Sequence, residues 1–239
     1  MSKELEFDIN ISRDENQYYL FNDGTILEIG YCSDTDLQNN EDIDNPRNWE
    51  HDSKFITFNR SSVSPDENEF GHWDKMLKHF GVVIDDDQPR YMKSELAQLD
   101  AKALEQGIAI LPVWKYDHSD IVLRAAENNP FPDAMYDSGL VGVIYENLNG
   151  RDANEVKDQL RNEVEMYDRY LHGDIYRYAI YDREGNEQDC GSGYYDMEDL
   201  IFNSAGSDKP VKDLGCHSDI ANCLYENRKE LAQTRGNER

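Results

Sequence analysis

The densest group of residues that could do chemistry follows a long apolar stretch near the middle of the chain. Residues 116–120 read Tyr-Asp-His-Ser-Asp and come directly after the apolar residues 108–114. Asp, His and Ser are the residue types of a hydrolytic triad, and polar residues at strand ends often carry catalysis. Adjacent side chains of a strand point to opposite faces, so these three cannot form a triad among themselves. A small hydrolase or nucleotide-modifying enzyme would need Asp117 and His118 to meet a distant group such as Cys190. The simpler interpretation is a turn whose Asp and Ser bond the backbone.

Two kinds of acidic run could attract a metal ion. Asp34-x-Asp36 and Asp42-x-Asp44 offer calcium-type oxygen ligands, but they lack the Gly and the terminal Glu of an EF-hand loop. Residues 85–87 are three consecutive Asp, and adjacent side chains rarely converge on one ion. Solvated acidic loops are therefore the favoured interpretation, and we expect no metal.

The cysteines and the common catalytic motifs add no specific signal. Cys216, His217 and Cys223 are close in sequence but supply too few ligands for a zinc site, so free thiols are expected. The chain contains no Gly-rich phosphate loop, no G-x-S-x-G and no H-E-x-x-H. We expect no cofactor, and the lack of these motifs favours a binding protein over an enzyme.

Charge is the strongest remaining signal. The chain has 50 Asp and Glu against 24 Lys and Arg, a net charge of −26 over 239 residues. Such an excess destabilises a compact state through self-repulsion. A compact chain of this length is about 45 Å across, and duplex DNA of that length carries roughly 26 charges. The charge is therefore of the size needed to imitate a nucleic acid, although an ordinary acidic and soluble protein also fits it.

The acidic residues are concentrated in two segments. Residues 1–50 contain 13 acids and 3 bases, residues 151–200 contain 14 acids and 6 bases, and residues 201–239 are balanced. In the loop 33–53 only Arg47 offsets the acids. A helix over 152–171 carries acids at i,i+3 spacing, with basic residues between them. Acids at 4–28 or 182–199 could join the loop by folding. The expected partner-binding residues are Asp34, Asp36, Glu41, Asp42, Asp44, Glu50, Asp52, Glu155, Asp158, Glu165 and Asp168.

The pattern of apolar residues and turns predicts an α+β fold with a mainly antiparallel sheet and helices packed on it. We expect one domain over 1–239, with an acidic loop at about 33–53 and a helical C-terminal extension at about 196–239. Strands are predicted at 5–11, 18–21, 25–31, 55–58, 108–114, 121–123, 140–145, 175–181 and 187–194, and helices at 67–80, 92–106, 152–171, 196–203 and 218–233.

Three stretches between residues 107 and 195 carry a set of shared motifs. Residues 112–119 read PVWKYDHS, similar to LYLYDHSG. Residues 136–145 read YDSGLVGVIY, similar to WDSGQVGFIY, and residues 167–176 read YDRYLHGDIY, similar to YDQYLTGDVY. In order and spacing they resemble a family of small acidic proteins, mostly of unassigned function, from bacteriophage and plasmid genomes. The chain departs from that pattern at Asp120, Leu140 and Arg177. The first 100 residues match only loosely, and the last 40 are particular to this chain.

The resemblance implies a mobile-element origin and supplies no catalytic residues. Together with the charge it favours, by analogy, an antidefence inhibitor (anti-restriction or anti-CRISPR) that is not an enzyme. The expected partner is a basic nucleic-acid-binding protein or complex in the host bacterial cytoplasm, with a homodimer as a further alternative. No direct contact with nucleic acid or membrane is expected, since both are negatively charged. A third class is a phage regulatory or scaffolding protein that uses Trp49, Trp73, Tyr194 and Tyr195 at a conventional interface.

Overall fold

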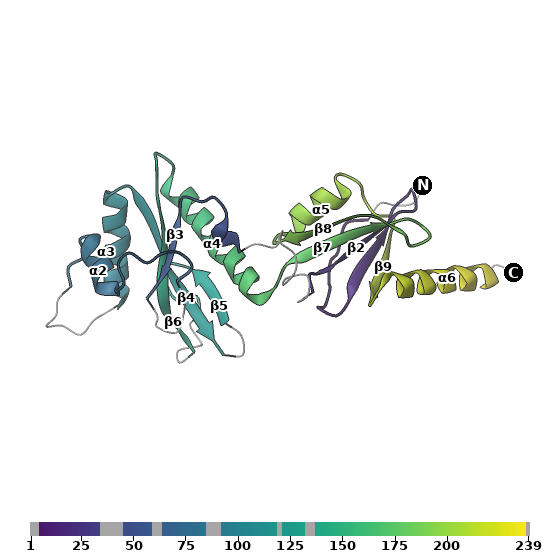
Figure 1. Cartoon of the computed structure of the whole chain (residues 1–239), viewed down its shortest axis with the longest axis horizontal. Coiled ribbons are helices and arrows are strands. Elements are labelled where there is room, and N and C mark those ends of the chain that lie inside the picture. The colour runs from purple at the N-terminus through teal and green to yellow at the C-terminus, as the bar shows by residue number, and fades with distance from the viewer. Residues whose placement is uncertain are drawn as a thin grey trace. The chain divides into compact units, whose positions relative to one another are not determined.

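The computed structural model describes residues 5–33, 45–58, 64–84, 92–118, 121–131 and 137–237. The chain forms two compact units (Figure 1). Residues 45–171 form one, here called the central unit, and residues 1–44 with 172–239 form the other, here called the terminal unit. The single domain expected from the sequence is therefore corrected. Each unit has its own sheet, and among the described residues no strand of one sheet pairs with the other.

The central unit is a four-stranded sheet with helices on both faces. The strand order is β3 (Lys54–Thr57), β6 (Ser138–Asn147), β4 (Ile108–Asp117) and β5 (Ile121–Ala125). The predicted interior strand at 108–114 is confirmed, because β4 lies between β6 and β5. Side chains of successive residues on β4 alternate between two separate cores, as a strand requires.

Each of these two cores is completed by helices. Leu111 and Val113 face α4 (Ala153–His172) through Val156, Leu160 and Val164. Ile110 faces the opposite core, which contains residues of α2 (Trp73–His79) and α3 (Met92–Glu105). Figure 1 shows α2 and α3 on one side of this sheet and α4 on the other. A short 3-10 helix, η1 (Pro46–Asn48), precedes β3.

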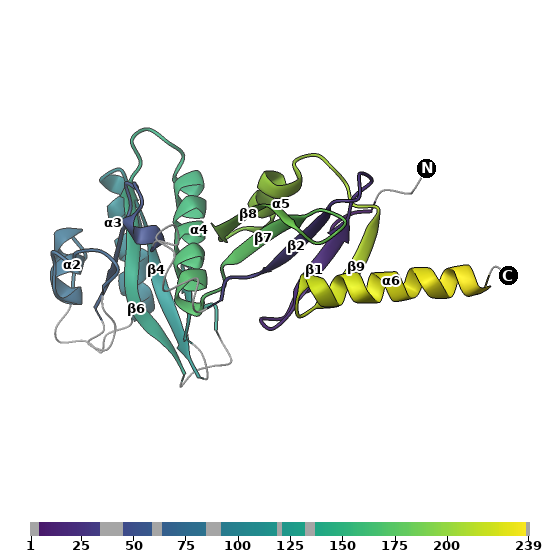
Figure 2. The ribbon, with the colours of Figure 1, turned by 45° about the vertical axis from the view of Figure 1, so that its right-hand side comes forward.

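The terminal unit is a five-stranded sheet. Its order is β8 (Glu187–Tyr194), β7 (Tyr176–Tyr181), β2 (Ile26–Tyr31), β1 (Asn16–Leu20) and β9 (Lys212–His217). Helix α5 (Met197–Ala205) covers one face, where Leu200 packs on Tyr19 and Leu27. Helix α6 (Ile220–Asn237) begins against the other face, where Cys223 packs on Tyr18 and Ile26. Figure 2 shows the two helices on opposite sides of this sheet.

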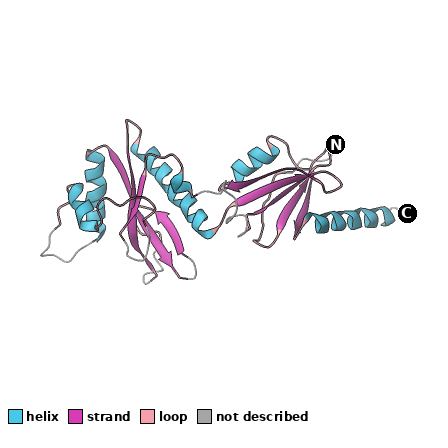
Figure 3. Cartoon of the chain, in the orientation of Figure 1, coloured by secondary structure: helices cyan, strands magenta, loops and turns pink. Residues whose placement is uncertain are grey.

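The α+β class is confirmed (Figure 3), since all strand pairs in both sheets are antiparallel. Three parts of the predicted pattern are wrong, and two of them concern helices. The helix expected over 67–80 begins only at Trp73. The C-terminal segment 196–239 is not a purely helical extension, because β9 lies within it and pairs with β1.

Residues 5–11 form no strand, although the predicted alternation of burial is present. Phe7, Ile9 and Ile11 pack against the core under α5, while the residues between them are exposed. Side chains bond much of this backbone, and the N–H of Leu5 donates to the carbonyl of Pro210, which lies in no strand, at 2.8 Å. The Gln17 side chain donates to the carbonyl of Asp8 at 2.8 Å, and the Tyr19 hydroxyl donates to the same oxygen at 2.9 Å. The apolar pattern of residues 5–11 thus predicted which side chains are buried, but it did not predict whether the segment pairs with a strand.

Candidate partner-binding surface

Five of the acids expected to bind a partner lie outside the described residues. These are Asp34, Asp36, Glu41, Asp42 and Asp44. The two that follow them, Glu50 and Asp52, are exposed on either side of His51, between η1 and β3. The described structure therefore bears on only the last part of the acidic loop.

Arg47 does not offset the acids of this loop. Its side chain is 3% exposed and lies inside the central unit. It pairs with Asp66 at 2.5 Å and with Glu163 of α4 at 2.7 Å, and it donates to the hydroxyl of Ser53 at 3.2 Å. A buried charge is tolerated only when it is paired and hydrogen-bonded, and this network meets that condition. The only base between residues 34 and 52 is thus used for structure.

The acids of α4 are largely neutralised by neighbouring arginines. Asp158 pairs with Arg161 at 2.5 Å, and Glu165 pairs with Arg169 at 3.0 Å. Glu155 is exposed in the first turn, where a carboxylate is stabilised by the helix dipole. The predicted i,i+3 spacing of these acids is present, but their charge is shared with bases on the same surface.

Asp168 has to be removed from the set of exposed acids. It is buried, with 5% of its surface exposed, and it lies at the contact between α4 and β5. One carboxylate oxygen accepts the backbone N–H of Leu123 at 2.8 Å, and the other pairs with Arg124 at 2.6 Å. Burial of a carboxylate requires such partners. The side chain therefore holds the helix to the sheet and is not available to a partner.

The least compensated acids of the described chain lie in the terminal unit. The segment 182–199 contains one base, Arg183, and its acids are Asp182, Glu184, Glu187, Asp189, Asp196, Glu198 and Asp199. Within the ranges that the structure describes, none of these seven acids forms an ion pair. The guanidinium of Arg183 is turned to the β1–β2 turn and donates to the carbonyl of Asp23 at 3.0 Å. We call the seven residues the acidic strip.

The acidic strip follows an edge of the sheet. Asp182 and Glu184 lie in the β7–β8 turn, and Glu187 and Asp189 lie on β8, which is the edge strand. Charged residues on an edge strand also keep it from pairing with other chains, which is their ordinary role. Some strip acids have local bonds: Asp182 accepts backbone N–H groups in its turn, and Asp196 caps α5. Glu184, Glu187, Glu198 and Asp199 are exposed, so they carry the charge that a partner can reach.

An exposed aromatic residue lies beside the acids of α5. Phe202 is 73% exposed, and it follows Glu198 and Asp199 by four and three positions, which places all three on one face of the helix. A large aromatic among charged groups is typical of a protein–protein contact. Sequence reasoning missed this residue. The signal was the apolar run Leu200-Ile-Phe202, since a helix cannot turn three successive residues to one core.

The aromatic residues named from the sequence are mostly not exposed. Trp49 is 44% exposed, but Tyr195 is buried, and Trp73 and Tyr194 are half-buried. Trp73 packs edge-on against Phe58, and Tyr194 packs against Tyr178. Of the four, only Trp49 lies on the surface of its unit.

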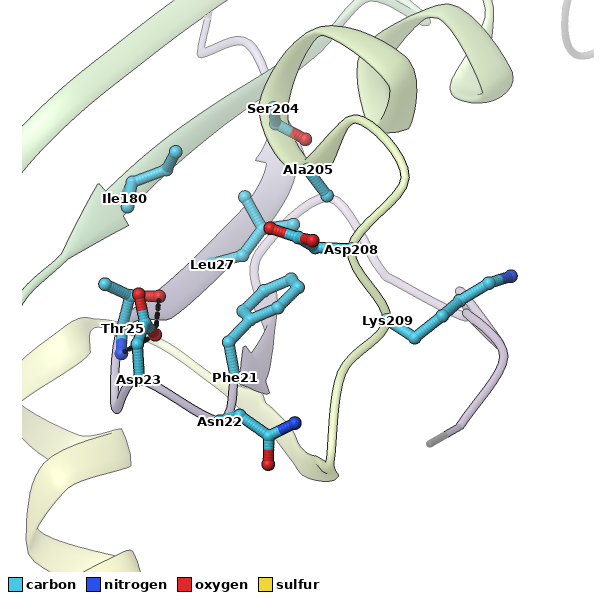
Figure 4. A pocket seen from close by; sticks show the side chains of 10 residues that line it. All are labelled: Phe21, Asn22, Asp23, Thr25, Leu27, Ile180, Ser204, Ala205, Asp208 and Lys209. Carbon is cyan, nitrogen blue, oxygen red and sulfur yellow. Dashed lines mark hydrogen bonds between the residues drawn. The ribbon is translucent and has the colours of Figure 1, made fainter. Parts of the chain in front are cut away.

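A cavity of about 410 Å³ lies between the β1–β2 turn and the C-terminal end of α5 (Figure 4). Apolar side chains make up part of its wall: Phe21, Leu27, Ile180 and Ala205. Two carboxylates, of Asp23 and Asp208, also line it (Figure 4). The backbone N–H and hydroxyl of Thr25 both donate to Asp23, and these bonds hold the pKa of Asp23 below its usual value. Asp23 is therefore ionised at neutral pH.

The base at the rim of this cavity is turned away from it. Lys209 lines the cavity through its stem, while its ammonium group pairs with Glu6. In Figure 4 this group points away from Phe21 and Asp208. The cavity is thus acidic as well as partly apolar, a combination that suits a cationic group with an apolar or planar body.

The residues of the alternative enzymatic site have structural partners. Asp117 pairs with Lys115 at 2.5 Å, and the ring of His118 stacks on Tyr116 at 9° between the planes. Both belong to the central unit, whereas Cys190 lies on β8 of the terminal unit. Burial and then the nearby Glu187 and Asp189 raise the pKa of the Cys190 thiol. An activated thiol has a lowered pKa, so this environment works against a nucleophile.

Within the described ranges, no group of three or more His, Cys, Asp or Glu residues could hold a metal ion. No helix within those ranges is both long enough and apolar enough to cross a bilayer.

Comparisons with known proteins give no match. No protein-family model, no curated protein and no solved structure matches this chain.

Proposed function

We propose that this protein is a non-enzymatic inhibitor that imitates the charge of a nucleic acid and occupies a basic nucleic-acid-binding groove of a bacterial defence complex. The observation that carries the proposal is the acidic strip, seven acids without an ion pair among the described residues. The surface that imitates phosphates is then the strip, and not the arginine-paired face of α4.

The location of the strip supports this function. The strip places acids on two successive elements: Glu187 and Asp189 lie on the edge strand β8, and Glu198 and Asp199 lie in the first turn of α5. The terminal unit as a whole contains 26 acidic and 10 basic residues, so its field attracts a basic surface from a distance.

Electrostatic association of this kind depends on salt. Screening is stronger at higher ionic strength, so binding of the protein to its partner falls steeply as salt is added. A partner that binds nucleic acid is also displaced by competing duplex DNA, because both ligands occupy the same groove. Salt-dependent binding together with displacement by duplex DNA distinguishes a protein that imitates a nucleic acid from one that is merely acidic.

The test is a capture experiment with the full chain and bacterial host lysate at about 0.05 M and about 0.5 M salt. The expected result is capture of a nucleic-acid-binding protein at low salt, its release at high salt and its displacement by duplex DNA. A variant with Glu184→Gln, Glu187→Gln, Glu198→Gln and Asp199→Asn is expected to lose capture.

A matched control removes four charges from acids that are ion-paired. It combines Asp158→Asn, Glu165→Gln, Glu226→Gln and Glu230→Gln, whose partners are Arg161, Arg169, Lys229 and Lys212. This control changes the net charge equally and is expected to keep capture. Equal loss in both variants, or capture that is insensitive to salt and DNA, would contradict the proposal.

A second candidate function is a regulatory or scaffolding protein with a conventional interface. The exposed Phe202 favours it, because an aromatic anchor contributes to binding without imitating a phosphate. Capture that is abolished by Phe202→Ala but unaffected by duplex DNA would support this second function over the first.

A further inference from the structure

We infer that the cavity beneath α5 receives an arginine side chain of the basic protein partner. This inference rests on the proposed function, since it specifies what one site of the inhibitor recognises. The cavity lies in the terminal unit between Phe21 and Leu27 of the β1–β2 hairpin, Ile180 of β7 and Ala205 at the end of α5. It is therefore formed by three segments that the fold brings together.

The size of the cavity fits a side chain. Pockets for small ligands have volumes of about 300–1,000 Å³. At about 410 Å³ the cavity is near the lower end of that range, so it suits one long side chain and not an extended polymer. The two features would thus have different roles in one interface. The acidic strip attracts a basic surface, and the cavity binds a single side chain.

The chemistry of the wall selects a cation with a flat face. In Figure 4 the ring of Phe21 lies among the lining side chains, and the same wall carries the carboxylates of Asp208 and of Asp23, the latter beside Thr25. A guanidinium group can stack on an aromatic ring and donate to carboxylates in its own plane. An ammonium group is a compact and strongly hydrated charge that makes less use of the ring. Arginine is therefore the occupant that this wall fits.

Among the described residues, the two bases near the cavity already have partners. Lys209 is engaged by Glu6, and Arg183 donates to the carbonyl of Asp23, from where its charge adds to the lowering of the pKa of the Asp23 carboxyl. Thr25 bonds a single carboxylate oxygen of Asp23, which leaves the other available to a donor from a partner. Among the described residues Asp208 has no side-chain hydrogen bond or ion pair that would compete.

The experiment uses the isotope-labelled full chain and three capped amino acids as probes, followed by NMR titration. The probes are N-acetyl-arginine methylamide, the lysine analogue, and the citrulline analogue, which has the shape of arginine without its charge. Saturable shifts around residues 21–27 and 204–209 are expected with arginine. Binding of the lysine probe is expected to be weaker, and that of the citrulline probe about tenfold weaker or absent.

Two variants and a control test the location. Asp208→Asn removes one carboxylate, and Ala205→Leu fills the apolar wall without changing charge, so each is expected to weaken arginine binding about tenfold. Asp14→Asn removes one exposed charge from the same unit outside the cavity and is expected to leave binding unchanged. The amide spectrum of each variant shows whether the unit is folded. If Ala205→Leu does not fold, the Asp208→Asn variant still tests the site, because Asp208 is exposed and its replacement does not disturb the core.

The outcomes separate this inference from the proposed function. Unsaturable shifts, equal binding of citrulline, or unchanged affinity in Asp208→Asn would overturn the arginine site. Salt-sensitive, DNA-competed capture by the wild-type chain would still support the inhibitor in that case. Arginine binding at the cavity without any such capture would leave the site in place and refute the function.

Discussion

Arg47 and Glu163 are 116 positions apart in the sequence, and their side chains meet at 2.7 Å inside the central unit. The same guanidinium pairs with Asp66 at 2.5 Å. One residue thus connects η1, the segment after β3 and the middle of α4. Because Arg47 is buried in this network, the sole base of the acidic loop is not at the surface. The residue therefore stabilises the central unit and does not neutralise the acids of the loop.

We predict that Arg47→Ala destabilises the central unit strongly. Removing the guanidinium leaves two carboxylates without their buried partner, which costs about 3–5 kcal/mol of unfolding free energy. Denaturant unfolding followed by tryptophan fluorescence measures it. Arg161→Ala is the control, since its pair with Asp158 is partly exposed. The control should lose about 1 kcal/mol or less, and equal losses in the two variants would refute a buried network.

Asp168→Ala is predicted to destabilise the central unit, unlike the same change at Asp158. It removes the carboxylate that accepts the buried N–H of Leu123 and pairs with Arg124, and these two losses together cost about 2–4 kcal/mol. Asp158→Ala changes stability by about 1 kcal/mol or less. Thermal and denaturant unfolding of the two variants give the comparison. If Asp168→Ala instead reduced partner capture with full stability, its assignment to the interior would be wrong.

The terminal unit is predicted to lose stability above about pH 9. Burial first, and then Glu28, raise the pKa of the Cys223 thiol to about 12. An unfolded chain has a thiol of ordinary pKa near 8.5, so above that pH the unfolded state loses its proton first. The buried, protonated Cys223 thiol therefore makes its full contribution to stability below the ordinary pKa of a thiol. That contribution is lost as the pH rises towards the pKa that the thiol has in the folded unit.

The pH dependence is measured by denaturant unfolding at intervals from pH 7 to about pH 11. Cys223→Ala is expected to be less stable at pH 7, through lost packing, and to show a shallower decrease with pH. Tyr178 and Tyr181, whose pKa values burial raises to about 12, contribute a decrease common to both chains. Parallel curves for the two chains would mean that the thiol does not carry this dependence.

Phe202→Ala is predicted to weaken partner capture without destabilising the terminal unit. The side chain is 73% exposed and contributes little to the core, so the free energy of unfolding should change by about 0.5 kcal/mol or less. Leu200→Ala, two positions earlier and fully buried, should cost about 2–5 kcal/mol. Binding isotherms and unfolding curves of both variants are needed. Unaltered capture by a folded Phe202→Ala chain would exclude this residue from the interface.

The sequence predicted the elements whose signals are local. The β1–β2 hairpin forms between the strands predicted at 18–21 and 25–31, with Gly24 at a φ of +89°, and α3 and α4 lie within one residue of the predicted ranges 92–106 and 152–171. In each case the turn residues and the side-chain period act over a few positions. Glycines with positive φ follow both helices, Gly81 after α2 and Gly107 after α3.

Elements that depend on a distant partner were not predicted. Strand β9 has the sequence KDLGCH, which lacks a clear apolar alternation, and it is a strand because β1 pairs with it. The reverse holds for residues 5–11, whose alternation is clear but whose backbone is bonded by Gln17 and Tyr19. The division into two units likewise follows from which strands pair, and a strand's pattern does not state its partner.

The sequence by itself determined the amount of negative charge, its two concentrations and the α+β class. Only the tertiary structure decided which acids remain unpaired. Asp168 and Glu163 meet arginines from other segments, whereas the acids of 182–199 meet none among the described residues. The reason is physical: a residue's charge is fixed by its type, but its compensation requires a partner within about 4 Å, and folding alone sets that distance.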